Sequence, residues 1–420
     1  MNCLFVNIKG LLQTLAPEIK LLKGAEMRQL AQIEDAYLWV EDGQIAAYGP
    51  MAQCPDTGSA EVIDARGRYV LPTWCDSHTH LVFAATREKE FEMRIAGMTY
   101  EAIAEAGGGI LNSARRLQET AYEELYKAAH QRVLDLISLG TGALEIKSGY
   151  GLDLPAELKM LRVIAQLKKA MDIPIRATFL AAHAIPEAYK QQPDEYVKQI
   201  CEVWIPEVAA LGLANYIDVF CEKNYFTVAQ TQYIVQVAQA HGLPAKLHLN
   251  QFNALGGVTM AVENKAMTVD HLEVLTEEDL KALQKGTTLP VALPNCSFFL
   301  GLSYTPARTI MSAGLPLALA SDYNPGSAPS GNMNTVLSLA CIKMKMTPEE
   351  AINAATINGA YAMGVADEVG SITVGKKANL ILTKPLTAYS VLPYSFGANL
   401  IEDVFIQGKK KPAYEHSSPQ

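Results

Sequence analysis

The chain lacks the patterns that mark several classes of protein. Its seven cysteines are scattered through 420 residues, are odd in number and include no Cys-x-x-Cys pair, so the sequence predicts neither a disulfide framework nor a zinc ribbon. We interpret them as reduced thiols of a cytoplasmic protein. Lys9, Gly10 and Pro17 interrupt the short apolar patches at the start of the chain, so we expect neither a signal peptide nor a membrane span there.

Basic charge is also scarce. The formal net charge is −9, and a nucleic-acid partner requires a basic face, so we expect no such partner. The only lysine run, Gly408 to Lys411, is interpreted as a solvated tail. The composition itself, 49% hydrophobic and 19% charged residues, is typical of a globular protein. The length fits two or three domains, or one large barrel with an accessory domain.

Both ends of the chain have the character of β-structure. Residues 35–50 form two alternating runs around the turn signal Asp42-Gly43, which predicts a β-hairpin. Residues 370–384 and 399–411 show a similar pattern. We therefore predict one small β domain built from residues 1–69 and 367–420, with a larger domain, residues 70–366, inserted between its two parts.

The inserted segment alternates short apolar runs with amphipathic helical stretches. Helices are predicted at 154–172, 227–242, 276–285 and 347–364. The eight apolar runs are 69–81, 141–151, 174–184, 216–224, 244–252, 267–275, 288–299 and 315–325. Eight such strands separated by helices predict a parallel sheet closed into a (β/α)₈ barrel. The alternative, an open doubly wound sheet, would require a glycine-rich turn after the first strand, and residues 78–88 have no Gly-x-Gly-x-x-Gly pattern.

The histidines fall where a barrel enzyme carries its active site. Five of the eight, with one aspartate, lie at the carboxyl ends of predicted strands: His78, His80, His183, His248, His271 and Asp322. His78 and His80 point to the same side of their strand, and a shell of three nitrogens and one oxygen would be completed by His248 and Asp322. Such a shell suits zinc, and also ferrous iron or manganese. The other histidines, 130, 241 and 416, are interpreted as hydrogen-bonded rim residues.

Four longer segments carry a family resemblance: FEMRIAGMTYEAIAEAGGGI (91–110), EIKSGYGLDL (145–154), TFLAAHAIP (178–186) and SDYNPGSAP (321–329). With the histidine pattern they resemble the amidohydrolase superfamily and, within it, the imidazolonepropionase family, over essentially the whole chain. The resemblance implies a distorted (β/α)₈ TIM-type barrel and a small β-sandwich built from both chain ends. It also implies hydrolysis of 4-imidazolone-5-propanoate to N-formimino-L-glutamate, the third step of histidine degradation.

The resemblance further implies roles for individual residues, and a homodimer. One divalent metal ion, Zn²⁺ or Fe, would be held by His78, His80, His248 and Asp322. The substrate would be contacted by Arg87, Tyr100, Tyr150, His183, Gln251, Asn324, Gly326 and Ser327. The catalytic residues would be Asp322, His271 and Gln251. Asp322 would accept the proton of the attacking water, and His271 would orient that water or stabilise the developing oxyanion.

Two of these residues leave alternatives open. Arg87 suits the propionate of the substrate, because a guanidinium binds a carboxylate through two parallel hydrogen bonds. Its alternative is a surface ion pair with Glu88 or Glu90. Gln251 stands where the family usually carries glutamate; it can hydrogen-bond the substrate ring but cannot carry a proton.

The role of Gln251 therefore distinguishes two hypotheses about the mechanism. In the interpretation that we favour, Asp322 and His271 handle the protons and Gln251 only positions the ring. If the family's glutamate is the essential proton shuttle, this chain should be slow or use another substrate. Two competing functions are another cyclic amidohydrolase or deaminase on the same scaffold, and a non-catalytic binding protein.

Overall fold

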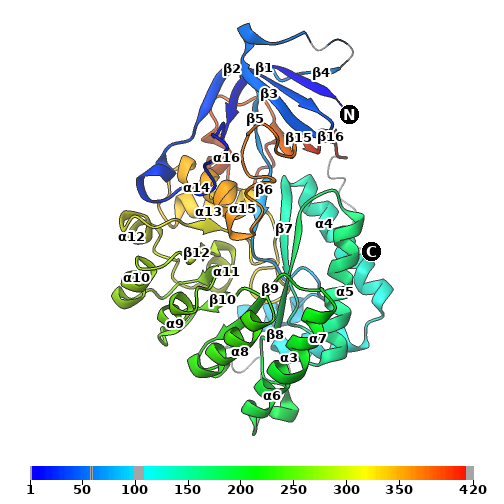
Figure 1. Cartoon of the computed structure of the whole chain (residues 1–420), viewed down its shortest axis with the longest axis vertical. Helices are drawn as coiled ribbons and strands as arrows, with labels where there is room; N and C mark the ends of the chain where they lie inside the picture. The colour runs from blue at the N-terminus through cyan, green and yellow to red at the C-terminus, as the bar shows by residue number, and fades with distance from the viewer. Residues whose placement is uncertain (1, 57, 59, 99–107, 413–420) are drawn as a thin grey trace.

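The computed structural model describes residues 2–56, 58, 60–98 and 108–412. They form an accessory sheet and a barrel, which lie one above the other in Figure 1. The accessory sheet contains strands from both ends of the chain, whereas the barrel is formed by the middle. The predicted (β/α)₈ barrel with a separate sheet of chain-end strands is thus confirmed.

The barrel contains eight strands, and neighbours pair in parallel in the order of the sequence. They are β6 (Trp74–Asp76), β7 (Thr141–Lys147), β8 (Ile175–Ala182), β9 (Tyr216–Cys221), β10 (Lys246–Leu249), β11 (Thr268–His271), β12 (Leu289–Ala292) and β13 (Ala318–Leu319). The first and last strands meet through residues that follow them. The amide of Asp322 donates to the carbonyl of His78 (3.0 Å), and the amide of His80 donates to the carbonyl of Tyr323 (2.8 Å). This junction joins two of the predicted metal-ligand segments directly.

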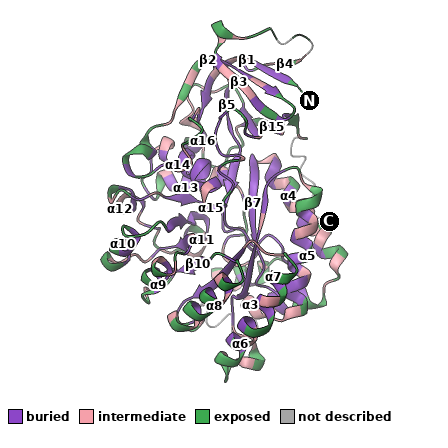
Figure 2. Cartoon of the chain, viewed as in Figure 1, coloured by how far each residue is buried: buried purple, intermediate pink, exposed green. Residues whose placement is uncertain are grey.

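Burial on both sides explains why the sequences of the barrel strands are continuous apolar runs. Every residue of β7, β9, β10, β11 and β12 is buried, and Figure 2 shows the barrel strands in the colour of buried residues with exposed faces on the surrounding helices. Strands covered on one side by helices and on the other by the barrel interior have no solvated face to alternate with. Each of the eight predicted runs contains one barrel strand.

The first of these runs, 69–81, is divided between the two parts of the molecule. Its beginning forms β5 (Tyr69–Pro72), which pairs with strands of the accessory sheet, and the barrel starts only at β6. The two strands are separated by Thr73 alone, so a single apolar stretch serves both sheets. The predicted boundary between residues 69 and 70 remains a prediction.

The helices surround the barrel. Among the described residues, the α-helices are α1 (Glu88–Ile95), α3 (Gly109–Glu119), α4 (Tyr122–Ser138), α5 (Leu154–Ala170), α6 (Pro193–Gln199), α7 (Ile205–Ala210), α8 (Val228–Ala240), α9 (Gly257–Glu263), α10 (Glu277–Leu283), α11 (Pro294–Leu300), α12 (Ala307–Ser312), α13 (Met333–Ile342), α14 (Pro348–Ala355), α15 (Ile357–Ala362) and α16 (Val391–Tyr394). Short 3₁₀ helices lie at Gly24–Arg28, Met51–Gln53 and Glu187–Tyr189, and a π-helical turn lies at Ile200–Trp204. Thr227 and Thr276, the N-caps of α8 and α10, accept hydrogen bonds from the amides of Gln230 and Asp279, as capping boxes require.

One predicted helix is wrong in its extent. The segment 347–364 forms two helices, α14 and α15, which are separated at Thr356. The backbone of Thr356 leaves the helical region (φ −115°, ψ −93°), and its hydroxyl donates to the carbonyl of Ile352 (2.5 Å) and accepts from Nε2 of Gln13 (2.7 Å). A tertiary contact with the amino-terminal segment thus accompanies the break, and helical periodicity alone cannot reveal such a contact.

The accessory sheet joins the two ends of the chain. Its strands are β1 (Cys3–Leu12), β2 (Gln32–Glu41), β3 (Gln44–Pro50), β4 (Glu61–Asp64), β5, β14 (Leu380–Thr383), β15 (Ile401–Ile406) and β16 (Lys409–Lys410). Their order is β16-β15-β14-β5-β1-β2-β3, with β4 also paired to β1. The predicted hairpin is confirmed as β2 and β3, and both Asp42 and Gly43 have positive φ (48° and 79°), as a type I′ turn requires.

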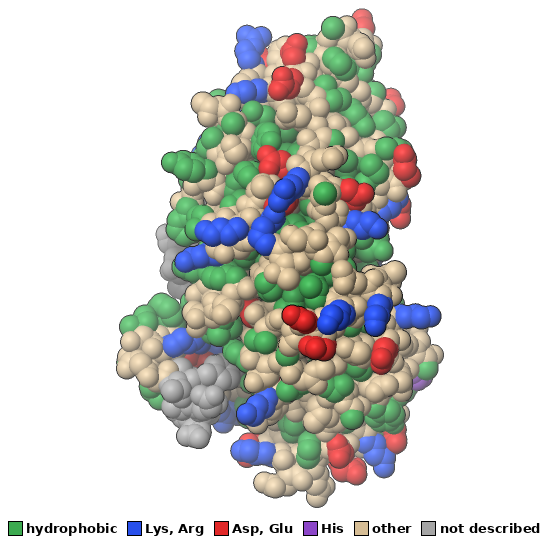
Figure 3. Space-filling view, turned by 90° about the vertical axis from the view of Figure 1, so that its left-hand side faces the viewer, with side chains coloured by type: hydrophobic (Ala, Val, Ile, Leu, Met, Phe, Trp, Pro, Cys, Tyr) green, Lys and Arg blue, Asp and Glu red, His purple; other side chains and the backbone are tan. Residues whose placement is uncertain are grey.

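Three further observations concern the chain as a whole. All seven cysteines are free thiols, as the sequence predicted. Among the described residues, no helix has the length and apolar composition needed to span a membrane. On the face drawn in Figure 3, acidic and basic side chains are interspersed, so that face carries no continuous basic surface of the kind that binds a nucleic-acid backbone.

Candidate active site

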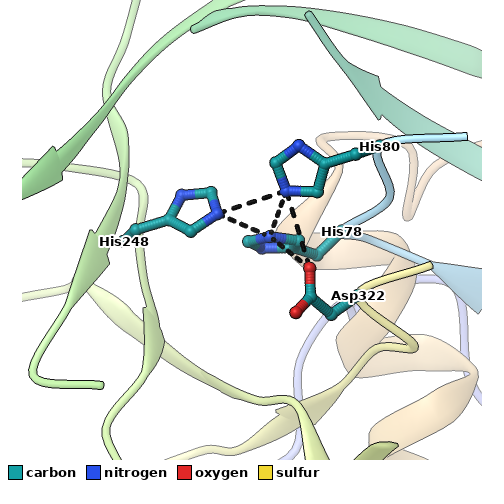
Figure 4. Close-up of side chains that lie close together, drawn as sticks. All are labelled: His78, His80, His248 and Asp322. Atoms are coloured by element: carbon teal, nitrogen blue, oxygen red, sulfur yellow. Dashed lines mark hydrogen bonds and ion pairs between the residues drawn. The ribbon is translucent and has the colours of Figure 1, made fainter. Parts of the chain in front are cut away.

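Three imidazoles and one carboxylate meet at the carboxyl ends of the barrel strands. The Nε2 atom of His78 lies 3.0 Å from Nε2 of His248 and 3.3 Å from Nε2 of His80. The Oδ1 atom of Asp322 lies 3.5 Å from Nε2 of both His78 and His80. Figure 4 shows the four side chains pointing toward one another. All four are buried, and one ligand atom from each lies within 4.8 Å of all the others.

The four side chains occupy different positions relative to the barrel strands. His78 and His80 follow β6, and His248 lies within β10. Asp322 follows the short β13, and its backbone is in the left-handed region (φ 56°), which is also the case for His271 at the end of β11 (φ 84°). Such conformations are unfavourable for residues other than glycine and cluster at functional sites, where the surrounding structure holds them.

The donor atoms of this cluster fit a single divalent cation. Nδ1 of His78 lies 2.6 Å from Asp270 Oδ2, and Nδ1 of His248 lies 2.8 Å from Asp218 Oδ2, so each ring donates its Nδ1–H to a carboxylate. Burial lowers the pKa of both rings well below the ordinary value of 6.5. Their Nε2 atoms therefore carry lone pairs that face one another, an arrangement that a cation would stabilise. Three nitrogens and one carboxylate oxygen form a donor set typical of zinc and also found with iron.

A cavity opens above this cluster, and most of the predicted site residues line it. Its walls include His80, Arg87, Tyr150, His183, His248, Gln251, His271, Asp322, Asn324, Gly326 and Ser327, together with Arg94, Ile110, Phe220, Phe252 and Leu300. His78 does not line the cavity and is fully buried. Tyr100, also predicted to contact the substrate, lies outside the described residues. Residues from seven separate stretches of the sequence are thus brought to one place.

The side chain of Arg87 is buried and forms part of the cavity wall. Its Nε donates to the hydroxyl of Ser113 (2.8 Å), and its Nη1 lies 3.9 Å from Oε2 of Glu90. The alternative ion pair is thus present with Glu90, but the Arg87 side chain is only 7% exposed, so the pair does not lie at the surface. Its Nη2 is buried and has no hydrogen-bond partner among the described residues. A buried guanidinium with an unused donor is well suited to bind an anion.

The glycine at position 326 makes room for that guanidinium. A Cβ atom built on Gly326 would lie 2.4 Å from Nη1 of Arg87, closer than any non-bonded contact allows. The amides of Gly326 and Ser327 both donate to Oδ1 of Asn324 (2.8 Å each). Nδ2 of Asn324 donates to the carbonyl of Asp322 (2.6 Å) and to the hydroxyl of Ser327 (2.9 Å). The side chain of Asn324 therefore shapes the loop that follows the eighth strand.

His183 and Tyr150 form another part of the wall. Nδ1–H of His183 donates a hydrogen bond to the carbonyl oxygen of Gly149 (3.0 Å), so in the neutral ring Nε2 carries no proton. Burial lowers the pKa of His183 to about 4, so the ring is neutral near neutral pH. Its ring stacks on His80, with centroids 5.2 Å apart. Tyr150 is also buried, and its ring centroid lies 5.7 Å from Cζ of Arg87.

His271 has a carboxylate partner of its own. Its Nδ1 lies 3.3 Å from Oε1 of Glu273, which also accepts from the hydroxyl of Ser297 (3.0 Å). Burial alone lowers the pKa of His271, but Glu273 and nearby aspartates outweigh that effect and raise it above 6.5. The ring can therefore hold a proton beside the cluster of metal-ligating side chains, as a group that stabilises a developing negative charge needs to do.

Gln251 is oriented by a thiol. Its Nε2 donates to Sγ of Cys296, 3.2 Å away. Burial raises the pKa of Cys296 well above its ordinary value, and Asp322 and Glu273 raise it further, so the group is a neutral thiol. His271, Glu273 and Cys296 also offer ligand atoms within 4.8 Å of one another, but a protonated thiol is a poor metal ligand, and His271 is already paired with Glu273.

Sequence reasoning missed the residues that orient the site. These are the carboxylates Asp218, Asp270 and Glu273 and the thiol of Cys296. The buried charges Glu145, Lys147 and Lys246, which do not contact the cavity, were missed as well. A signal was present, because Glu145 and Lys147 stand two positions apart in an otherwise apolar run, as do Lys246 and His248. Residues at that spacing share one face of a strand, and charges there have no place in an ordinary core.

The chain matches a known family over most of its length. The model of the Amidohydrolase family matches residues 69–411. A protein named imidazolonepropionase from Christiangramia forsetii is 55% identical over 409 residues, which cover 97% of this chain and 100% of that protein. The chain belongs to the imidazolonepropionase family of amidohydrolases. Another relative of that name, from Geobacillus kaustophilus, is 40% identical over 97% of this chain and 98% of its own length.

Solved structures with the same fold are more distant from this member of the imidazolonepropionase family. An adenosine deaminase from Xanthomonas campestris with bound zinc has a TM-score of 0.70 at 18% identity, covering 97% of this chain and 92% of that one. A guanine deaminase from C. acetobutylicum with bound guanine has a TM-score of 0.69 at 16% identity, covering 98% and 100%. At such low identity the likeness shows the fold alone.

Proposed function

We propose that this chain is an imidazolonepropionase, which hydrolyses the ring amide of 4-imidazolone-5-propanoate to give N-formimino-L-glutamate in the third step of histidine degradation. The observation that carries the proposal is a single cavity that is lined by three residues of the metal-ligand cluster and by the buried guanidinium of Arg87. The substrate has the two matching features, a hydrolysable ring carbonyl and a carboxylate. The family membership of the whole chain supports the same activity.

The four clustered residues would hold the cofactor. His78, His80, His248 and Asp322 are proposed to bind one divalent ion, Zn²⁺ or Fe. When bound, such an ion lowers the pKa of a coordinated water toward about 7 and so supplies a nucleophile at neutral pH. The chain's own residues then have to place the substrate, move the proton and stabilise the charge that develops on the carbonyl oxygen.

Proton transfer is assigned to Asp322 and charge stabilisation to His271. Asp322 would accept the proton of the attacking water and deliver it to the ring nitrogen that leaves when the carbonyl C–N bond breaks. His271, whose pKa is raised by Glu273, would donate a hydrogen bond to the carbonyl oxygen as it becomes negative. In this scheme no proton passes through Gln251, whose amide would only hydrogen-bond the ring.

Substrate placement is assigned to the remaining cavity residues. The unused Nη2 donor of Arg87 would bind the propionate, and Gly326 and Ser327 would line the same end of the substrate. Nε2 of His183, which carries no proton, can accept a hydrogen bond from a ring N–H. Tyr150 and Tyr100 are proposed as further contacts, and Asn324 would act by holding the loop of Gly326 and Ser327.

The first test is direct. Protein loaded with Zn²⁺ or Fe²⁺ is mixed with freshly generated 4-imidazolone-5-propanoate, and the loss of the imidazolone ultraviolet absorbance is followed while product is identified by mass. We expect rapid turnover that stops on addition of a chelator and returns with metal. Metal-loaded protein that leaves the substrate to decay at its spontaneous rate would contradict the proposal.

A second test separates this activity from a deaminase or another cyclic amidohydrolase on the same scaffold. Arg87→Met is compared with wild type on the substrate and on its propanamide, which lacks the carboxylate. Loss of a charged hydrogen bond costs about 1.5–3 kcal/mol, so we expect wild type to lose roughly 10- to 100-fold in kcat/KM on the propanamide. Arg87→Met should treat both compounds alike. If the variant still prefers the carboxylate, Arg87 does not bind it.

The proposal also covers the surroundings of the enzyme. We infer a cytoplasmic homodimer that acts on a small molecule and binds neither nucleic acid nor a membrane. The free cysteines and the mixed surface charge are consistent with this inference. Sedimentation of the purified protein would test the dimer.

A further inference from the structure

A layer of charged side chains lies inside the barrel beneath the metal-ligand cluster. Glu145 and Lys147 come from β7, and the others are Asp218 from β9, Lys246 from β10 and Asp270 from β11. None of the five is exposed to solvent. Burying a charge is costly unless it is paired, so each member of such a layer must be held by its neighbours.

Lys147 contacts three carboxylates at once. Its Nζ lies 2.7 Å from Oε1 of Glu145, 2.9 Å from Oδ2 of Asp218 and 3.7 Å from Oδ2 of Asp270. Burial alone lowers the pKa of Lys147, but these three carboxylates outweigh that effect and raise it, so the side chain is an ammonium. The positive charge of Lys147 therefore lies between Asp218 and Asp270.

The same two aspartate oxygens orient the imidazoles. Oδ2 of Asp270 accepts from Nδ1 of His78 (2.6 Å), and Oδ2 of Asp218 accepts from Nδ1 of His248 (2.8 Å). Two chains of contacts, one through each aspartate, therefore start from one ammonium and end at the two rings whose Nε2 atoms are 3.0 Å apart. Lys147 does not touch either ring, and it is separated from both by a single carboxylate.

We propose that Lys147 is a positioning residue for the metal site, whose ammonium fixes Asp218 and Asp270 so that the Nε2 atoms of His78 and His248 converge. Without the Lys147 ammonium, the buried carboxylates of Asp218 and Asp270 repel each other. Each also loses its contact with Nζ, which holds in place the Oδ2 atom that accepts the imidazole hydrogen bond. The rings can then rotate about χ2, and the metal site opens. Partners beyond the direct ligands commonly change metal affinity by about 10- to 100-fold.

The chain contains a matched control for this role. Lys246 is also a fully buried lysine of the same layer, and it pairs with Glu145. Its Nζ donates in addition to the carbonyls of Ser77 (3.1 Å) and Ala362 (2.9 Å). Among the described residues, its hydrogen bonds and ion pairs include neither Asp218 nor Asp270. Removing it therefore costs the barrel one buried cation without removing a direct partner of either aspartate.

The inference rests on the proposed metal site, and its experiment tests the two separately. Wild type, Lys147→Met, Lys147→Gln and Lys246→Met are compared for Zn²⁺ affinity by competition with a chelator. The visible absorption spectrum of the Co²⁺ form of each protein reports the ligand geometry without reference to activity. Thermal unfolding of the metal-free proteins measures the purely structural loss.

We expect both Lys147 variants to bind Zn²⁺ about 10- to 100-fold more weakly than wild type and to change the Co²⁺ spectrum. Lys246→Met should lose thermal stability but keep the wild-type spectrum and an affinity within a few-fold of wild type. Equal affinity and equal spectra in the Lys147 and Lys246 variants would overturn the inference and leave the metal site standing. Failure of both Lys147 variants to fold, with Lys246→Met folded, would also overturn it by assigning Lys147 to folding. A wild type that binds no metal would overturn the proposed function itself.

Discussion

The core of the accessory sheet and the interior of the barrel are equally shielded from water but hold different side chains. The accessory core is apolar and is formed by strands from both chain ends, with Phe5 of β1 packed edge-on against Phe405 of β15 at 4.9 Å. The barrel interior holds ionisable groups, and among them Lys147, Asp218 and Asp270 have no exposure.

This difference in composition indicates that the apolar core mainly stabilises the fold, whereas the charged barrel interior mainly supports the active site. An apolar core gains free energy from every group it removes from water. A buried ionic network roughly balances its own desolvation and is a poor source of stability. Its presence in the barrel is explained by the site above it, whose imidazoles need fixed carboxylates. Substitutions in the two regions should therefore change different measured quantities.

The largest effect is expected for Asp322→Ala. This change removes both a proposed metal ligand and the proposed base, and general bases alone contribute about 10²- to 10⁴-fold to rates. We expect kcat to fall by at least that factor, with Zn²⁺ affinity also reduced, while far-ultraviolet circular dichroism stays unchanged. The exposed Asp367 provides the control, since Asp367→Ala should leave both quantities as in wild type. A variant that keeps metal and turnover would show that Asp322 has neither role.

A large effect on stability alone is expected for Phe5→Ala in the accessory core. Phenylalanine to alanine changes in cores cost about 3–5 kcal/mol in the free energy of unfolding. Chemical denaturation would measure this loss, and kcat/KM and metal content of the folded protein should not change. Phe396, which is 57% exposed, is the matched control, and Phe396→Ala should alter stability by no more than about 0.5 kcal/mol. Loss of metal in folded Phe5→Ala protein would show that the two regions are not independent.

A smaller effect, confined to substrate binding, is expected for Gly326→Ala. The added methyl would occupy the place of the Arg87 guanidinium and displace it. We expect KM to rise by roughly 10- to 100-fold, corresponding to loss of one charged hydrogen bond, with little change in kcat. The propanamide analogue should be hydrolysed equally by variant and wild type. A KM at the wild-type value would mean that the guanidinium can move without cost to binding.

The smallest effect is expected for Gln251→Glu. If Asp322 and His271 move the protons, restoring the family's usual glutamate should change kcat by less than about tenfold, which corresponds to 1.4 kcal/mol. Gln251→Leu, which cannot hydrogen-bond the ring, should lower kcat/KM more than Gln251→Glu does. A rise in kcat of about 10²-fold or more in Gln251→Glu would identify that position as a proton shuttle and contradict the roles given to Asp322 and His271.

Much of the fold and part of the candidate site could be predicted from local sequence. The eight apolar runs predicted the barrel strands, because a strand buried on both sides needs apolar residues without alternation. Asp42-Gly43 predicted its hairpin through the positive φ that its turn requires. His78 and His80 could be placed at the carboxyl end of the first strand because a strand's side chains alternate with a period of two residues.

What the sequence by itself determined is therefore what depends on near neighbours: the barrel strands, the starts of four helices and the candidate ligands. Only the tertiary structure decided that Thr356 breaks a helix, that Arg87 is buried beside Gly326, and that Lys147 lies between Asp218 and Asp270. Each of these depends on contacts between segments far apart in the chain. Such contacts are set by the register and closure of the sheet, and no local pattern of residues encodes them.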